Sequence, residues 1–288
     1  MRHNVLTSPR LRELKKRKRR VFWRKVFLIT FGFLVIIGIF SYVSRNAKVN
    51  IYTVEISGNE IIDTKLIKEI VDEKLIGYYL KLFPKTNFLL YPKGAIKDEL
   101  GNRFKRLKNI SFELKDINTL KISVAERTAL YTWCGENLPE LNMDEQTCYF
   151  LDESGFIFDE APYFSGEVYL RFYGLDGINL ENPAGFYFSR KIFNNLITFK
   201  KNIEEMGLKP RAFYVSGDGE VKMLLSIAGA RKNPEIIFKA DTDFNKVAEN
   251  LQAALDTEPL LSKFKIQYSF LQYIDLRFGN KVYYKFSR

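Results

Sequence analysis

The sequence predicts an α+β protein with a single N-terminal transmembrane helix, a small β-α-α-β-β domain and a mainly antiparallel β domain with two or more helices. Three observations predict this class. An uncharged apolar run covers residues 26–43. Beyond it, apolar and polar residues alternate as in strands, and other stretches carry apolar residues at helical spacing. We expect a cytoplasmic tail over 1–25, a transmembrane helix over 26–43, a first domain over 48–126 and a second over 127–288.

The apolar run VFLITFGFLVIIGIFSYV, residues 26–43, is long enough to cross a bilayer. As a helix it extends about 27 Å, close to the thickness of the hydrocarbon core. A cleaved signal peptide is the alternative, but its apolar core is usually shorter and ends in small residues. The exit at 41–46 reads SYVSRN and has no such cleavage site. The sequence therefore favours an uncleaved anchor.

The tail before this run determines its orientation, because Lys and Arg resist translocation. Residues 1–25 contain eleven Lys and Arg against the single acid Glu13. The N-terminus is therefore expected in the cytoplasm and the chain after about Arg45 outside. The tail also accounts for nearly all of the net charge of +11, so it predicts topology and contact with anionic lipid rather than nucleic-acid binding. The orienting residues nearest the membrane are Lys15, Lys16, Arg17, Lys18, Arg19, Arg20, Arg24 and Lys25.

In the first domain, alternation over 52–56 predicts a strand that ends in a turn at 57–59. Asp63 is suited to cap a helix with an apolar stripe, and a second helix is expected after Pro92. The stretch 77–91 between them is aromatic and is expected to form an irregular packed loop. A hairpin follows. The apolar positions of the two helices are Leu66, Ile67, Ile70 and Val71, then Ile96, Leu100, Phe104 and Leu107, and those of the hairpin are Ile110, Phe112, Leu114, Leu120, Ile122 and Val124.

The order β-α-α-β-β over 48–126 resembles a POTRA domain, a small module that envelope proteins place just outside a membrane. Three later segments extend the resemblance: VAER at 124–127 with the strand ending at Trp133, CYFLDESGFIF at 148–158, and Asp275-Leu276-Arg277 near the C-terminus. In this order, after a membrane anchor, they resemble the bacterial cell-division family FtsQ/DivIB. The stretch 77–93 and the two cysteines depart from the general pattern of that family.

The resemblance implies a non-enzymatic membrane scaffold of the bacterial divisome, placed in the inner membrane at the division septum. It implies coiled-coil division proteins as partners, FtsB with FtsL or DivIC, bound through the last strands of the β domain. No cofactor, metal or small-molecule substrate is implied. Two alternatives stay open: an envelope translocation or assembly factor that uses its POTRA domain, and a membrane-tethered cell-wall enzyme.

In the second domain, the turn 152–155 places Gly155 where a positive φ is needed. Ser189 is suited to cap a helix over 190–206 that Gly207 ends, with Ile192, Leu196 and Ile203 facing inward. Asp241 or Thr242 is suited to cap another helix, whose apolar residues are Phe244, Val247, Leu251 and Leu255. The segment Gly217-Asp218-Gly219 is expected to be a hairpin turn rather than a phosphate loop.

The C-terminal hairpin allows two registers. A two-residue turn at Gly279-Asn280 pairs Phe278 with Lys281 and mixes apolar and charged side chains on one face. A three-residue loop, 279–281, instead places all the apolar residues on one face. We therefore expect the pairs Phe278 with Val282, Leu276 with Tyr284 and Ile274 with Phe286. This register sets Arg277 opposite Tyr283, and Asp275 opposite Lys285 as a cross-strand charge pair.

The last strand has no later strand to pair with and is expected at a sheet edge, where it can accept a partner strand through main-chain hydrogen bonds. The expected partner site is Lys281, Val282, Tyr283, Tyr284, Lys285 and Phe286. The alternative is an edge that its two lysines merely protect from pairing.

The two cysteines, Cys134 and Cys148, both lie outside the membrane in the expected topology. An even number of cysteines in an oxidising compartment suggests a disulfide, and two buried thiols are the alternative. Two sulfurs alone do not make a zinc site.

Enzymatic chemistry finds little support in the sequence. The single histidine, His3, lies in the cytoplasmic tail, so the external part has no Ser-His or Cys-His relay. Adjacent carboxylates such as Asp152 with Glu153, or Glu204 with Glu205, do not share a face as a glycosidase pair requires.

Overall fold

The computed structural model describes residues 9–139, 146–174, 178–226 and 233–287. The chain divides into two compact units. The first comprises Met1–Arg103 and Asn109–Ala125, and the second comprises Phe104–Lys108 and Glu126–Arg288. Residues 104–108 therefore group with the second unit although they precede most of the last two strands of the first. Each unit is described by itself.

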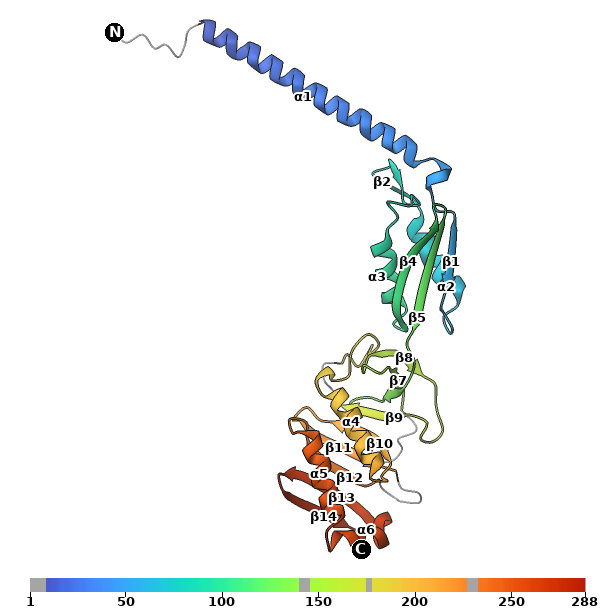
Figure 1. Cartoon of the computed structure of the whole chain (residues 1–288), viewed down its shortest axis with the longest axis vertical. Helices are drawn as coiled ribbons and strands as arrows, with labels where there is room; N and C mark the ends of the chain where they lie inside the picture. The colour runs from blue at the N-terminus through green and yellow to red at the C-terminus, as the bar shows by residue number, and fades with distance from the viewer. Residues whose placement is uncertain (1–8, 140–145, 175–177, 227–232, 288) are drawn as a thin grey trace, which may run out of the picture. The chain divides into compact units, whose positions relative to one another are not determined.

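The chain begins with a long apolar helix, α1 (Pro9–Ser44), shown in blue in Figure 1. Within the described residues, its segment Glu13–Ser44 is the one helix long and apolar enough to cross a membrane. Its apolar side chains are almost all exposed, whereas those of a core helix would be buried. These properties are typical of a single membrane anchor or of a signal sequence.

The rest of the first unit has the predicted order β-α-α-β-β. Its three-stranded sheet runs β1-β5-β4, and β1 lies parallel to β5. Asp63 caps α2 as predicted, accepting a hydrogen bond from the backbone N–H of Lys65. The elements after α1 are η2 (Ala47–Val49), β1 (Thr53–Ser57), α2 (Thr64–Leu75), β2 (Tyr78–Tyr79), β3 (Phe83–Pro84), α3 (Lys93–Arg103), β4 (Leu107–Asp116) and β5 (Thr119–Glu126).

Two expectations for this unit need correction. The stretch 77–91 is not wholly irregular, because β2 and β3 form a short antiparallel hairpin in it. Helix α3 ends at Arg103, so Phe104 and Leu107 do not continue its apolar face. Leu107 instead opens β4, where a strand begins before the alternation becomes visible in the sequence.

The second unit contains a nine-stranded sheet in the order β14-β13-β12-β11-β10-β9-β6-β7-β8. The sheet is mixed, since β6–β9, β9–β10 and β12–β13 are parallel neighbours and the other neighbours are antiparallel. The elements are β6 (Tyr131–Trp133), β7 (Cys148–Leu151), β8 (Ile157–Ala161), β9 (Leu170–Gly174), α4 (Arg190–Glu205), β10 (Pro210–Val215), β11 (Glu220–Leu225), β12 (Glu235–Lys239), α5 (Phe244–Leu255), α6 (Leu260–Gln267), η3 (Tyr268–Phe270), β13 (Leu271–Phe278) and β14 (Lys281–Phe286).

The helices explain two of the three parallel pairs, β9–β10 and β12–β13. Parallel neighbours need a crossover connection, because a tight turn can join only antiparallel strands. Helix α4 connects β9 to β10, and α5 with α6 connects β12 to β13. Figure 1 shows α4 beside β9 to β11 and α5 nearer β12 to β14. The buried residues of the helices and of the strands form one core. It includes Phe193 and Leu196 of α4, Leu251 of α5, Phe172 of β9 and Phe238 of β12.

Two helix caps differ from the prediction. Ser189 precedes α4, but its side chain makes no capping hydrogen bond. With φ at 21°, Ser189 instead directs its backbone carbonyl to accept from the N–H groups of Ile192 and Phe193. Helix α5 is capped by Asp243, not by Asp241 or Thr242, through the N–H of Asn245. The turns at Gly155 and at 217–219 form as predicted, with Gly155 at φ 75°.

Candidate functional site

The hairpin of β13 and β14 contains the predicted partner strand, but the predicted register is wrong. Phe278 pairs with Lys281 across a two-residue turn, Gly279-Asn280. Asp275 pairs with Tyr283 instead of Lys285, and Ile274 pairs with Tyr284 instead of Phe286. Phe286 lies opposite Leu271. The turn has Gly279 at φ 64°, a left-handed conformation that glycine adopts without strain.

A bulge removes the conflict that had argued against this turn. Between Asp275 and Phe278 the pairing shifts, so β13 has one residue more than β14 in this stretch. The extra residue lets the short turn coexist with an apolar face. Val282, Tyr284 and Phe286 all pack against the main core. With a two-residue turn and no shift in register, charged and apolar side chains would share that face. No residue in this segment marks a bulge, so the sequence predicts a register from turn length alone.

The two faces of β14 consequently have different characters. Val282, Tyr284 and Phe286 are half-buried, whereas Lys281, Tyr283 and Lys285 are exposed. The exposed Tyr283 ring packs edge-on against Phe278, with ring centroids 5.3 Å apart. Among the described residues β14 has one strand neighbour, β13, and so forms an edge of the sheet. The outward face thus presents an aromatic pair flanked by two lysines.

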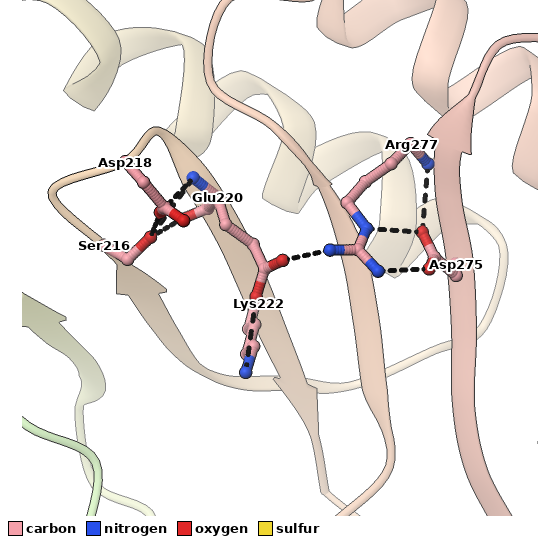
Figure 2. A network of polar contacts seen from close by, with 6 residues as sticks. All are labelled: Ser216, Asp218, Glu220, Lys222, Asp275 and Arg277. Carbon is pink, nitrogen blue, oxygen red and sulfur yellow. Dashed lines mark hydrogen bonds and ion pairs between the residues drawn. The ribbon is translucent and has the colours of Figure 1, made fainter.

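On the sheet face opposite the core, an ion-pair network braces the strand before this edge (Figure 2). The guanidinium of Arg277 donates from Nε to Asp275 Oδ1 at 2.9 Å and from Nη2 to Oδ2 at 2.6 Å. A further Arg277 nitrogen donates to Glu220 on β11, which also pairs with Lys222. Asp275 is therefore the carboxylate partner of Arg277, and the predicted pair with Lys285 does not form.

The network is electrostatic support and not a proton relay. Burial tends to raise the pKa of Asp275, but hydrogen bonds from the side chain and backbone of Arg277, together with its charge, outweigh burial and lower it. The hydrogen bond to Asp275 in turn raises the pKa of Arg277. Both groups are ionised at neutral pH, and the ion pair of Arg277 with Glu220 ties β13 to β11 across the intervening strand β12.

A groove of about 600 Å³ lies beside this network. Its lining contains cations and anions together: Lys191, Lys239 and Arg277, with Asp218, Glu220 and Asp241. At its rim, Asp218 accepts hydrogen bonds within the turn, from Ser216 and from the backbone N–H of Glu220 (Figure 2). Such a mixed lining indicates no particular charged ligand.

A second cluster joins Asp152 to Arg127, which belong to two separate sequence segments. Asp152 lies at 0% exposure. Its Oδ1 accepts from the Ser154 N–H at 2.8 Å, the Ser154 hydroxyl at 2.6 Å and the Phe156 N–H at 3.1 Å. Its Oδ2 accepts from Arg127, whose guanidinium also lies 3.9 Å from the centre of the Phe156 ring. The VAER and LDESG segments thus meet in one buried ion pair.

Arg106 lies next to this cluster, and the sequence did not predict a role for it. Its Nε donates to Asp159 at 2.7 Å, and its guanidinium lies over the Phe158 ring. Arg127 also donates a backbone hydrogen bond to the Arg106 carbonyl and a side-chain hydrogen bond to the Lys105 carbonyl. These contacts explain why residues 104–108 group with the second unit. A lone arginine before a strand offers no sequence signal for such a role.

Cys134 and Cys148, for which the sequence left two states open, form a disulfide. Trp133 pairs with Tyr149 on β6 and β7, so the cysteines follow and precede the paired residues directly. The sequence between them includes 140–145, which lie outside the described residues. The bridge closes the long connection between these two strands.

The orienting residues of the tail all lie on α1. Lys15 to Lys25 continue the same helix that carries the apolar run, and their side chains are exposed. No ion pair between these cations and an acid is present among the described residues. The helix therefore changes from basic to apolar at about Lys25, within one continuous element.

Two other strand edges in the described structure, β8 and β4, are less suited to accept a partner. At the far end of the sheet, the beginning of β8 is covered, since Ile157 exchanges backbone hydrogen bonds with Gly185 and Phe186. In the first unit, the edge strand β4 carries charges at Lys108, Glu113 and Lys115. Charged side chains discourage edge pairing. The β14 edge combines main-chain access with exposed aromatic surface.

Comparison with known proteins adds no assignment: no protein-family model matches the chain, and no curated protein shows significant similarity to it.

Proposed function

We propose that this chain is a non-enzymatic, single-pass membrane scaffold of the bacterial division machinery. Helix α1 anchors it in the inner membrane with the basic tail in the cytoplasm. The β-α-α-β-β unit lies outside, next to the membrane, and the larger unit carries the partner site. The proposal rests on the family resemblance of the sequence and on one structural observation, the edge strand β14 with its exposed Tyr283.

The mechanism is recruitment by strand addition. An extended segment of a partner pairs with the open side of β14, and main-chain hydrogen bonds supply affinity independent of sequence. Selectivity comes from the outward side chains. Tyr283 and Phe278 form a rigid aromatic contact, and Tyr is enriched among residues that dominate binding energy. Lys281 and Lys285 favour a partner strand with acidic residues.

The braced strand β13 makes this edge suitable for binding. Arg277 ties β13 to β11 through Glu220, while Asn250 on α5 donates to the Gly279 carbonyl at 3.2 Å. The edge strand is therefore held by neighbours on both sides of the turn before a partner arrives. A preformed strand loses less conformational entropy on binding than a disordered one. The extracytoplasmic ends of coiled-coil division proteins, FtsB with FtsL or DivIC, are the proposed partners.

Septal localisation tests the cellular part of the proposal. A fluorescent protein fused to the N-terminus leaves the external units unaltered. We expect a band at the division site in constricting cells. An even envelope signal throughout constriction would contradict the divisome assignment and favour an envelope assembly factor.

A point variant tests the site better than deletion of 281–288. Deletion would also remove Val282, Tyr284 and Phe286 from the core. Tyr283→Glu instead alters an exposed side chain and introduces charge at the centre of the edge. We expect partner affinity to fall at least about tenfold, in keeping with loss of an aromatic anchor of about 2 kcal/mol. The measurement is titration of the full-length chain in detergent with the purified external segments of the partners.

Tyr163→Glu is the matched control, since Tyr163 is an exposed tyrosine of the same unit that lies on no strand. It should bind like the unaltered chain. Equal affinities for both variants and the unaltered chain, with equal unfolding temperatures, would show that β14 is not the partner site.

A further inference from the structure

The hairpin β2–β3 in the first unit exposes apolar side chains at its tip. Tyr78 and Tyr79 form β2, and both rings are exposed. Leu80 follows at 87% exposure, among the most exposed large apolar residues outside α1. Lys81 completes the tip before Leu82. Exposed apolar side chains that cluster in this way mark a surface that contacts a partner or a membrane.

The backbone of the tip is strained for the residues it carries. Leu80 has φ 50° and Lys81 has φ 60°, and the Leu82 N–H donates to the Tyr79 carbonyl at 2.9 Å. Two successive positive φ values define a turn that normally carries Asn or Gly. A side chain in this conformation costs about 1–2 kcal/mol per residue. The hairpin therefore presents a leucine and a lysine where small residues would be more stable in water.

Hydrogen bonds hold this tip against the end of α1. The Ser41 hydroxyl donates to the Leu82 carbonyl at 2.8 Å, and Arg45 Nη2 donates to the Lys81 carbonyl at 3.0 Å. The Arg45 guanidinium also lies 5.8 Å from the centre of the Tyr78 ring. Ser41 is 6% exposed, so the hairpin covers this turn of the helix.

The position of Ser41 determines the depth of the tip. Ser41 belongs to the apolar run 26–43, only two residues before its end, or about 3 Å along the helix axis. If α1 spans the bilayer, the Leu82 carbonyl lies within one helical turn of the outer boundary of the hydrocarbon. A second exposed leucine, Leu89, is close in the chain to Phe88, whose N–H donates to the Val49 carbonyl just after α1.

We propose that the β2–β3 hairpin is a second membrane contact, whose tip enters the outer interface of the lipid bilayer beside α1. Leu80 reaches the acyl chains, while Tyr78 and Tyr79 lie at headgroup level, where aromatic rings with a polar end are favoured. Lys81 and Arg45 meet the phosphates of anionic lipids. The lipid surface is the occupant because the contact is continuous with the membrane-spanning surface of α1, including the exposed Tyr42.

This inference goes beyond the proposed function, since it depends on α1 as an anchor and not on any partner of β14. It also gives the stretch 77–93, which departs from the family pattern, a role of its own. The strain at Leu80 and Lys81 is then offset by apolar burial in lipid, where a leucine side chain gains about 1.5–3 kcal/mol.

Spin labelling tests the depth directly. The chain has two cysteines and both are in the disulfide, so an added cysteine is the single reactive thiol. The full-length chain carries a nitroxide at Leu80→Cys in vesicles of phosphatidylethanolamine and phosphatidylglycerol. Collisions with oxygen, which concentrates in lipid, and with a water-soluble nickel chelate report depth. Ile36→Cys on α1 marks the bilayer interior, and Ile61→Cys, beyond the far end of β1, marks water.

We expect the oxygen-to-nickel collision ratio at Leu80 to exceed that at Ile61 several-fold and to approach that at Ile36. A Leu80 ratio equal to that of Ile61, with the Ile36 label in lipid, would overturn the proposal. A Leu80 label shielded from both reagents would also overturn it, because it would indicate a second copy of the chain on the hairpin. An Ile36 label in water would remove the anchor and the proposal with it. A label at Leu89→Cys repeats the test at an independent position.

Discussion

The buried carboxylate of Asp152 leads to a sharp stability prediction for the substitution Asp152→Asn. The side chain keeps its size, but one of its two acceptor oxygens becomes an NH₂ donor. In one orientation this donor faces Arg127, and in the other it faces the three donors from Ser154 and Phe156. Either orientation opposes a donor to a donor in a fully buried place.

The magnitude follows from burial and from the number of contacts. Breaking a buried ion pair by removing one partner costs about 3–5 kcal/mol, because it leaves an uncompensated charge. The Arg127 side chain retains 13% exposure, so water relieves part of that charge. The lower end, about 3 kcal/mol, is therefore expected for Asp152→Asn. Arg127→Met should cost less, about 1.5–3 kcal/mol, since Asp152 keeps three hydrogen bonds.

The assay uses urea unfolding of the fragment 46–288. Trp133 is the single tryptophan of this fragment and is buried in the core of the second unit, so its fluorescence reports that unit. The double variant should cost less than the sum of the single variants, as expected for two residues in contact. Asp159→Asn is the matched control. Asp159 pairs with Arg106 but its side chain is 46% exposed, so a loss below about 1 kcal/mol is expected.

A loss at Asp152→Asn no larger than that at Asp159→Asn would refute the reasoning. It would mean that the Arg127 pair, for all its burial, does not stabilise the unit, as happens when the cost of desolvation cancels the attraction. Additive effects in the double variant would lead to the same conclusion.

Three further predictions concern the same unit. Gly174→Ala should destabilise it by more than about 3 kcal/mol, because a Cβ there would lie 1.9 Å from the Val215 carbonyl oxygen, whereas Gly207→Ala, with a similar positive φ but open space, should cost only about 1 kcal/mol in urea unfolding. Replacing both cysteines by serine should lower the free energy of unfolding by about 3 kcal/mol. The intact mass of the unaltered chain, measured without reductant, should be about 2 Da below the value for two free thiols. Acid should destabilise the fragment, and Asp152→Asn should remove this effect. Burial tends to raise the folded-state pKa of Asp152, but hydrogen bonds from Ser154, Phe156 and Arg127 outweigh burial and lower it. The contribution of Asp152 to stability is therefore complete above the unfolded pKa of about 4 and is lost as pH falls through the lower folded pKa, which unfolding measured between neutral pH and about pH 2 should show.

The partly correct account of the C-terminal hairpin shows where sequence reasoning stops. Alternation correctly placed Val282, Tyr284 and Phe286 toward the core. The register was wrong because it assumed an unbroken ladder, and one extra residue between Asp275 and Phe278 satisfies both the short turn and the apolar face. A bulge is stabilised by the packing around it, in which Leu276 and Ile274 are both buried, so local residue order does not reveal it.

The parallel pairs of the large sheet were not predicted, because the sequence indicated a mainly antiparallel domain and three neighbouring pairs are parallel. The expected helices account for two of these pairs, since a helix can form the crossover that parallel neighbours need. The meeting of Arg127 with Asp152 joins residues 25 positions apart. Their types indicate that a pair can form, but only the folded chain brings the turn after β7 next to Arg127 and excludes water from the carboxylate.

By itself the sequence determined the apolar helix, the order of the first unit, the Asp63 cap and the turns at Gly155 and 217–219, because each depends on neighbouring residues and on local dihedral preferences. The tertiary structure alone decided the register of β14, the partner of Asp275, the Asp152 ion pair and the strained tip at Leu80. Those features depend on packing and on charges brought together from distant segments, and their energies exist only after water has been excluded from the contacts.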